Sequence, residues 1–168
     1  RIINPMTNKA MQITKKVFSR LRTISGLRLL AENIEERLPV VSFYIEGMHY
    51  NLGVRLLNDR FGIQVRGGCS CAGTYGHYLL RVSKQHSHRI TEMIEHHDLS
   101  EKPGWIRMSL HPVMTDEEID FICDSIKKLS ENFKQWALDY YYDPHENNFL
   151  NKIKPDFEIS TVEKWFEE

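Results

Sequence analysis

Cysteine is scarce in this sequence of 168 residues, which contains only three. Cys69 and Cys71 are separated by a single residue and Cys123 is far away, unlike the pattern of a secreted protein held by disulfides. No apolar run is long enough to cross a membrane, and we expect no secretory signal sequence. Basic and acidic residues balance, 22 against 23, so no strong field favours a nucleic-acid partner. We therefore expect a cytoplasmic protein with reduced thiols that binds neither membrane nor nucleic acid.

The length of the chain is sufficient for one well-packed core and too small for two large ones. We assign residues 1–139 to a single domain. Residues 140–168 are rich in aromatic and acidic side chains, and we expect them to form a C-terminal tail that packs on this domain or is partly extended. Because the sequence begins at Arg1 and not at a methionine, we expect it to be part of a longer protein.

Apolar residues recur at helical spacing in three segments, and each segment carries a signal for a helix end. Pro5 suits the start of the first helix, and Gly62 suits the end of the second. Thr115 and Glu118 form a capping box at the start of the third. The three predicted helices cover residues 4–24, 50–62 and 115–136.

The clearest predicted strand is "PVVSFYIEG", which is rich in β-branched and aromatic residues and is bounded by a proline and a glycine. Three shorter segments also favour strands. The four predicted strands cover residues 27–31, 39–47, 63–67 and 104–112. Part of the histidine-containing segment 77–97 is expected to be helical, and a second capping box at Ser160 and Glu163 predicts a short closing helix. This order of elements indicates an α+β fold, a small mixed or antiparallel sheet covered by helices.

The segment "VRGGCSCAG", residues 65–73, places two cysteines in a glycine-rich loop. A thiol acts as a nucleophile when it is accessible and ionised. Glycines allow the loop unusual backbone angles, and Arg66 could lower a thiol pKa through its charge. Ordinary packing of small apolar cysteines is the alternative explanation. A disulfide between Cys69 and Cys71 would close a small, strained ring, so we do not expect one.

A metal site is a further alternative, because the chain has eight histidines. Several of them fall between His77 and His97, close in sequence to Cys69 and Cys71. Their spacing does not match the paired ligands of a structural zinc site, and neighbouring histidines on a helix point in different directions. We therefore predict no bound metal and interpret most of these histidines as a solvated helix face. A stand-alone metal-binding or redox module is kept as a competing function.

Two patches in order, "IQVRGGCSCAG" and "GWIRMSLHPVMTDEEIDFICDSI", resemble the C-terminal small domain of class V aminotransferase-fold enzymes, which depend on pyridoxal phosphate. Within that family, the sequence resembles in particular the cysteine desulfurases and selenocysteine lyases. The resemblance covers residues 6–136. It implies the α+β small domain of that fold, and a homodimer in the complete enzyme.

The resemblance also assigns roles to individual residues. Cys71 matches the cysteine that receives sulfur as a persulfide, and Arg107 matches the arginine that binds the substrate carboxylate. Arg66 matches a loop arginine near the same site. The cofactor lysine is expected outside this chain, so the implied enzyme needs pyridoxal phosphate while this chain alone is expected to be inactive and to bind no cofactor.

Cys69 and Ser70 depart from the desulfurase pattern, which usually has residues such as histidine there. The implied functions are therefore a cysteine desulfurase acting through a persulfide on Cys71, or a class V transaminase or lyase acting on another amino acid. The implied partners are an amino-acid substrate and, for a desulfurase, a sulfur-acceptor protein. The residues alone also allow a third function, that of an interaction domain that uses the segment from Tyr140 to Trp165.

Overall fold

The computed structural model describes residues 5–34, 36–68, 80, 83–96 and 98–153. Its helices are α1 (Pro5–Leu21), α2 (Tyr50–Phe61), α4 (Lys84–Glu95) and α5 (Asp116–Trp136). The strands of its main sheet are β1 (Leu27–Leu29), β2 (Val40–Ile45), β3 (Arg66–Gly68) and β4 (Trp105–Ser109). A 3-10 turn (Ala137–Asp139) leads into a hairpin of β5 (Tyr140–Asp143) and β6 (Asn148–Asn151).

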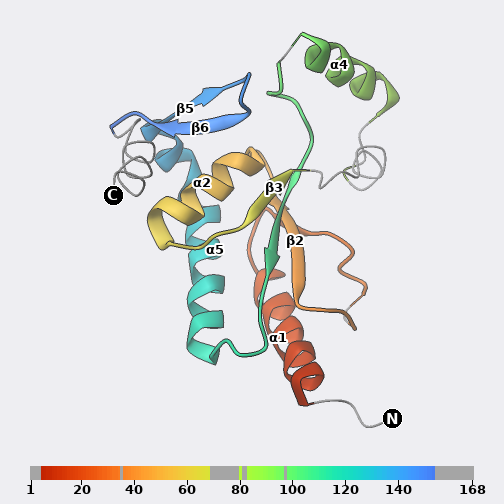
Figure 1. The fold of residues 1–168 in the computed structure, drawn as a ribbon, viewed down its shortest axis with the longest axis vertical. Helices are drawn as coiled ribbons and strands as arrows, with labels where there is room; N and C mark the ends of the chain where they lie inside the picture. Colours follow the sequence, from red (N-terminus) through yellow and green to blue (C-terminus); the bar gives the residue numbers. More distant parts are fainter. Residues whose placement is uncertain (1–4, 35, 69–79, 81–82, 97, 154–168) are drawn as a thin grey trace, which may run out of the picture.

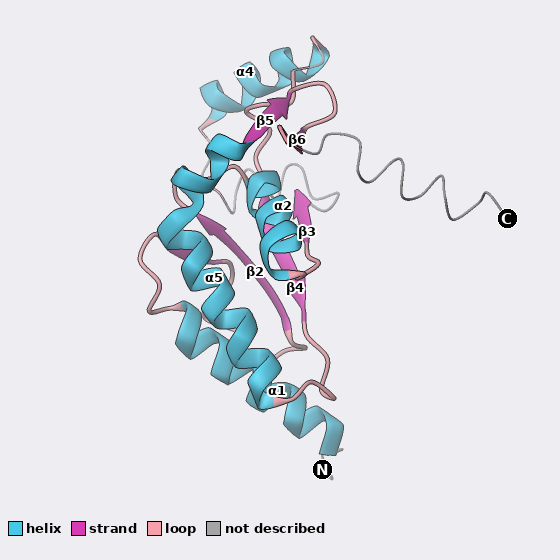
Figure 2. Cartoon of the chain, turned by 90° about the vertical axis from the view of Figure 1, so that its left-hand side faces the viewer, coloured by secondary structure: helices cyan, strands magenta, loops and turns pink. Residues whose placement is uncertain are grey.

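The main sheet is antiparallel throughout, in the order β1-β2-β4-β3. Helices α1, α2 and α5 cover one of its faces (Figures 1 and 2). The core lies between these layers and includes Phe18, Phe43, Leu56, Ile106 and Ile126, whose side chains are fully buried. The predicted α+β architecture, an antiparallel sheet covered by helices, is therefore confirmed.

The helix ends follow the signals in the sequence. Thr115 accepts a hydrogen bond from the Glu118 backbone N–H, and the Glu118 side chain accepts one from the Thr115 N–H. These reciprocal bonds satisfy backbone groups that the helix itself leaves without partners, and they confirm the predicted capping box. Gly62 ends α2 in the left-handed conformation, with φ of 66°, as predicted for that position.

All four strands of the main sheet are shorter than predicted. Pairing with β4 begins only at Arg66, so residues 63–65 lie outside the strand that we expected to start at residue 63. The first strand ends at Leu29 and not at Ala31, because Ala31 has a positive φ of 50°.

Within α4, Ile90 is buried as expected, whereas Ile94 is 38% exposed.

The segment after residue 139 begins with a hairpin that the sequence did not lead us to expect. Tyr140 is buried in the main core, and its hydroxyl donates a hydrogen bond to the Asp59 carboxylate. The rings of Tyr142 and Phe149 pack around His49 at the start of α2, with centroids 5.2 and 5.3 Å from it. Residues 140–151 are thus packed on α2, and the predicted closing helix lies outside the described residues.

No helix in the described part of the chain has both the length and the apolar character needed to cross a membrane.

His49 caps α2 with a neutral ring. Its Nδ1 accepts a hydrogen bond from the Asn51 backbone N–H at 3.2 Å, so the proton of the neutral ring lies on Nε2. That nitrogen is buried and has no hydrogen-bond partner among the described residues. Burial lowers the pKa of His49 from 6.5 to about 4, because a charged imidazolium would lose its hydration among the surrounding aromatic rings.

This lowered pKa predicts a pH-dependent stability. The folded chain binds the His49 proton more weakly than the unfolded chain does, so the free energy of unfolding falls as the pH drops from about 6.5 to about 4. In a His49→Asn variant, which keeps a helix-capping side chain that does not titrate, this part of the decline is absent. Urea unfolding of both proteins across this range tests it, and parallel stability curves would contradict the assignment.

Candidate functional site

The main sheet has one face toward the helices and one face away from them. Side chains alternate between the two faces along each strand, and in β2 Val41, Phe43 and Ile45 are buried while the residues between them are partly exposed. In β4, Ile106 and Met108 are buried, so Arg107 between them lies on the opposite face. We call this opposite side the open face.

Three polar residues form a row across the open face. Arg107 in β4 lies directly opposite Ser42 in β2 on one side and Arg66 in β3 on the other. Directly opposite residues in an antiparallel sheet share a face and have Cβ atoms about 5 Å apart. The structure therefore brings together Arg66 and Arg107, the two arginines to which the resemblance gave a substrate-binding role. That role itself stays a prediction.

The row concentrates positive charge that the described residues do not neutralise. Like charges directly opposite each other destabilise a sheet, yet no carboxylate among the described residues forms an ion pair with either arginine. Arg66 is exposed and Arg107 is half-buried, and the buried Nε of Arg107 has no hydrogen-bond partner. An anion bound between the two guanidinium groups would reduce their repulsion and could accept bidentate hydrogen bonds from them. The row can therefore bind a carboxylate.

The other predicted site residues are distributed differently. Cys71, Cys69 and His77 lie outside the described residues. Strand β3 ends at Gly68, three positions before Cys71 in the sequence, so the segment that carries Cys71 begins at the end of the strand that carries Arg66. Cys123 is buried in α5, and burial raises its pKa to about 11, which keeps this thiol protonated and unreactive.

Two described histidines of segment 77–97 belong to or follow α4 and lie in no strand of the main sheet. His88 and His96 are exposed, on α4 and just after it, and α4 lies away from the helix layer (Figure 1). Within the described residues, no three histidine, cysteine or acidic side chains come together in a way that could hold a metal ion.

The lysines bear on the expected cofactor, since pyridoxal phosphate needs a lysine for its Schiff base. None of the four strands of the main sheet contains a lysine. The described lysines lie on helices or in loops, and Lys16 is bonded to Asp120 across α1 and α5. The four described strands therefore supply no lysine for a Schiff base, whereas the arginine row has the chemistry to bind a carboxylate.

Ser42 was missed when the sequence was read alone. It is the only polar residue in the strand segment "VVSFYI" apart from Tyr44, and this interruption of an apolar run was the available signal. Its position opposite Arg107 depends on the register between β2 and β4, which local sequence does not define.

A comparison with protein families shows to which family the chain belongs. The family model described as aminotransferase class-V matches residues 2–122. The chain belongs to the class-V aminotransferase family. The match includes all four strands of the main sheet, and hence Ser42, Arg66 and Arg107, as well as the segment with Cys69 and Cys71.

Comparison with solved structures finds the cysteine desulfurase CsdA of Escherichia coli, in its S-sulfonic acid form, with 19% sequence identity and a TM-score of 0.49. The similarity covers 78% of this class-V chain and 27% of the CsdA chain. None of the curated proteins compared with the sequence matches it.

We expect the two opposed arginines to lower the free energy of unfolding when no anion is bound between them. Replacing Arg66 with Gln removes one of two like charges, so we expect the free energy of unfolding to rise by about 0.5 kcal/mol at low ionic strength. High salt screens exposed charges, so the difference between variant and parent should vanish near 1 M sodium chloride. A destabilised Arg66→Gln protein at low salt would show that the arginine is already paired.

Proposed function

We propose that this chain forms the small domain of a pyridoxal-phosphate-dependent class-V enzyme, in which Arg107 and Arg66 bind the α-carboxylate of an amino-acid substrate. The observation that carries this proposal is the row of Ser42, Arg107 and Arg66 on the open face, with a buried guanidinium nitrogen that has no hydrogen-bond partner in the described part of the chain. Membership of the class-V family supports it.

Arg107 suits this role through its chemistry and its position. A guanidinium presents two parallel N–H groups that match the two oxygens of a carboxylate. The half-buried position of Arg107 weakens competition from water, which strengthens the interaction with an anion. Arg66 adds a second positive charge from the neighbouring strand, so the carboxylate is held between two strands of one rigid sheet.

The cofactor and its lysine belong, in this proposal, to a larger part of the enzyme outside this chain. The isolated chain is then inactive and binds no cofactor. The complete enzyme acts as a homodimer in the cytoplasm, where a reactive thiol stays reduced.

We further propose that the substrate is L-cysteine and that Cys71 accepts its sulfur. In the net reaction the C–S bond of L-cysteine breaks and an S–S bond forms to the Cys71 sulfur. The carbon that loses sulfur gains a proton, so the products are alanine and a persulfide on Cys71. A sulfur-acceptor protein then removes the outer sulfur. The support is positional, because the Cys71 segment follows directly from the strand that carries Arg66.

A Cys71→Ser variant of the complete enzyme tests the desulfurase proposal. A serine hydroxyl cannot form a persulfide, so alanine and sulfide production from L-cysteine should fall to background. Cys69→Ser is the matched control and should retain most of the activity. Undiminished alanine production in Cys71→Ser excludes this role for Cys71. Transamination of another amino acid at an unchanged rate would instead identify a transaminase.

An Arg107→Lys variant tests the carboxylate site independently of Cys71. Lysine keeps the charge but loses the bidentate geometry, so we expect KM for L-cysteine to rise about tenfold or more. A variant at an arginine already paired on the surface, Arg89→Lys, is the control because Arg89 lies on α4 and pairs with Glu101. An unchanged KM in Arg107→Lys means that the carboxylate binds elsewhere.

A further inference from the structure

Tyr50 fills a space that two glycines leave open at one end of the sheet. It is the first residue of α2 and is buried. A Cβ atom at Gly104 would lie 2.5 Å from Cε1 of its ring, and one at Gly67 would lie 2.8 Å from its Cδ2. Such distances are too short for any side chain at either position, so the ring lies directly against the backbones of both segments.

The two glycines adjoin the arginine row. Gly67 follows Arg66 in β3 and lies opposite Ile106 of β4, and Gly104 directly precedes β4. Strand β3 is only three residues long and lies at the edge of the sheet, with β4 as its one described neighbour. Its remaining support comes from α2 beneath it. The Tyr50 ring therefore determines the position of the backbone next to Arg66 relative to β4.

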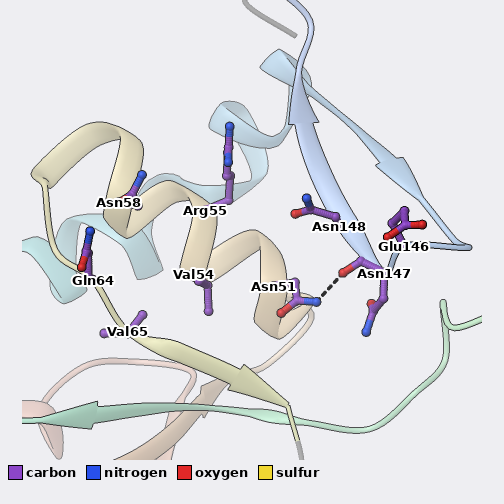
Figure 3. A pocket seen from close by; sticks show the side chains of 9 residues that line it. All are labelled: Asn51, Val54, Arg55, Asn58, Gln64, Val65, Glu146, Asn147 and Asn148. Atoms are coloured by element: carbon purple, nitrogen blue, oxygen red, sulfur yellow. Dashed lines mark hydrogen bonds between the residues drawn. The ribbon is translucent and has the colours of Figure 1, made fainter. Parts of the chain in front are cut away.

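The Tyr50 ring is in turn held by the hairpin turn. The Asn147 side-chain amide donates a hydrogen bond to the Tyr50 hydroxyl at 2.7 Å, and its oxygen accepts one from the Tyr142 hydroxyl at 2.9 Å. The Asn147 carbonyl also accepts a bond from the side-chain amide of Asn51, the second residue of α2 (Figure 3). Asn147 has a positive φ of 51°, a conformation that asparagine tolerates better than most residues.

These contacts form a chain from the hairpin to the arginine row. Asn147 fixes the hydroxyl end of Tyr50, and the ring of Tyr50 supports Gly67 and hence Arg66. Asn51 supports the same strand, because a Cβ at Gly67 would lie 2.6 Å from its side-chain oxygen. Figure 3 shows Asn51 and Asn147 meeting between α2 and the hairpin, beside the segment that leads into β3.

From this geometry we infer that Tyr50, held by Asn147, is a positioning residue that sets the placement of Arg66 relative to Arg107. This inference rests on the proposed carboxylate-binding function of the two arginines. It gives the hairpin, which lies at a distance from the open face, a part in substrate binding. Loss of the hydrogen bond from Asn147 removes one restraint on the ring, and a shift of the ring moves the short edge strand that lies against it.

An Asn147→Gly variant isolates this effect, because glycine keeps the positive φ while both side-chain hydrogen bonds are lost. Glu146→Ala is the matched control, since Glu146 lies in the same turn and is exposed. The first readout is the set of arginine Nε–H signals in NMR spectra of the 168-residue chain. We expect the Arg66 and Arg107 signals to shift in Asn147→Gly and to stay unchanged in Glu146→Ala. Arg28, which pairs with Glu46, should not shift in either.

The second readout is steady-state kinetics of the complete enzyme with L-cysteine. Binding of the carboxylate contributes equally to ground and transition states, so Asn147→Gly should raise KM about three- to tenfold and change kcat by less than about twofold. Tyr50→Phe keeps the ring and loses only the hydroxyl. It should give the same KM as Asn147→Gly, and the double variant should show no further increase, because both changes break the bond between Tyr50 and Asn147 that the inference depends on.

The outcomes separate this inference from the proposed function. If Asn147→Gly lowers the melting temperature but leaves the Arg66 and Arg107 signals in place, the bond is purely structural and the inference is wrong. If these signals are unmoved and KM still rises tenfold in Arg107→Lys, only the inference fails. If the signals move and neither variant changes KM, the two arginines do not bind the carboxylate, and both proposals are wrong.

Discussion

The alternation of side chains across β2 and β4 is the constraint on which the rest of this structure depends. The described helices α1, α2 and α5 cover one face of the sheet, and successive residues of β2 point in turn to the core and to the open face. In β4, Ile106 and Met108 point to the core, while Trp105 is also buried although it is on the same side as Arg107. Ile106 and Arg107 are neighbours in sequence, yet one is fully buried against the helices and the other faces away. A shift of register by one residue would bury the arginine and expose the isoleucine, so core packing also fixes the arginine row.

Helix α2 connects the regions of the chain that matter for this site. Its N-cap residue His49 and its first residues Tyr50 and Asn51 contact the hairpin, and Tyr50 and Asn51 also lie against β3. The hairpin is therefore a structural part of the domain and not a free tail, because Tyr140 is buried in the main core. Through this helix, residues far apart in the sequence determine how the short strand with Arg66 is held.

Local patterns predicted the elements well, and distant contacts explain what was missed. The capping box at Thr115 and the stop at Gly62 depend on residues within one or two turns, so the sequence alone was sufficient. The hairpin is different, because its packing depends on Asn147 meeting Asn51, 96 positions away. Likewise, the pairing of Arg66 with Arg107 follows from strand register. The resemblance of two short patches identified these arginines, but only the sheet places them side by side.

The most direct test of the account is a crystal structure of the complete enzyme with L-alanine, the product of the proposed reaction, bound at the active site. The account predicts that the carboxylate lies on the open face, with its oxygens about 2.8 Å from the guanidinium nitrogens of Arg107 and with Arg66 beside them. A carboxylate bound elsewhere, with Arg107 and Arg66 both making no contact to it, would contradict the central claim.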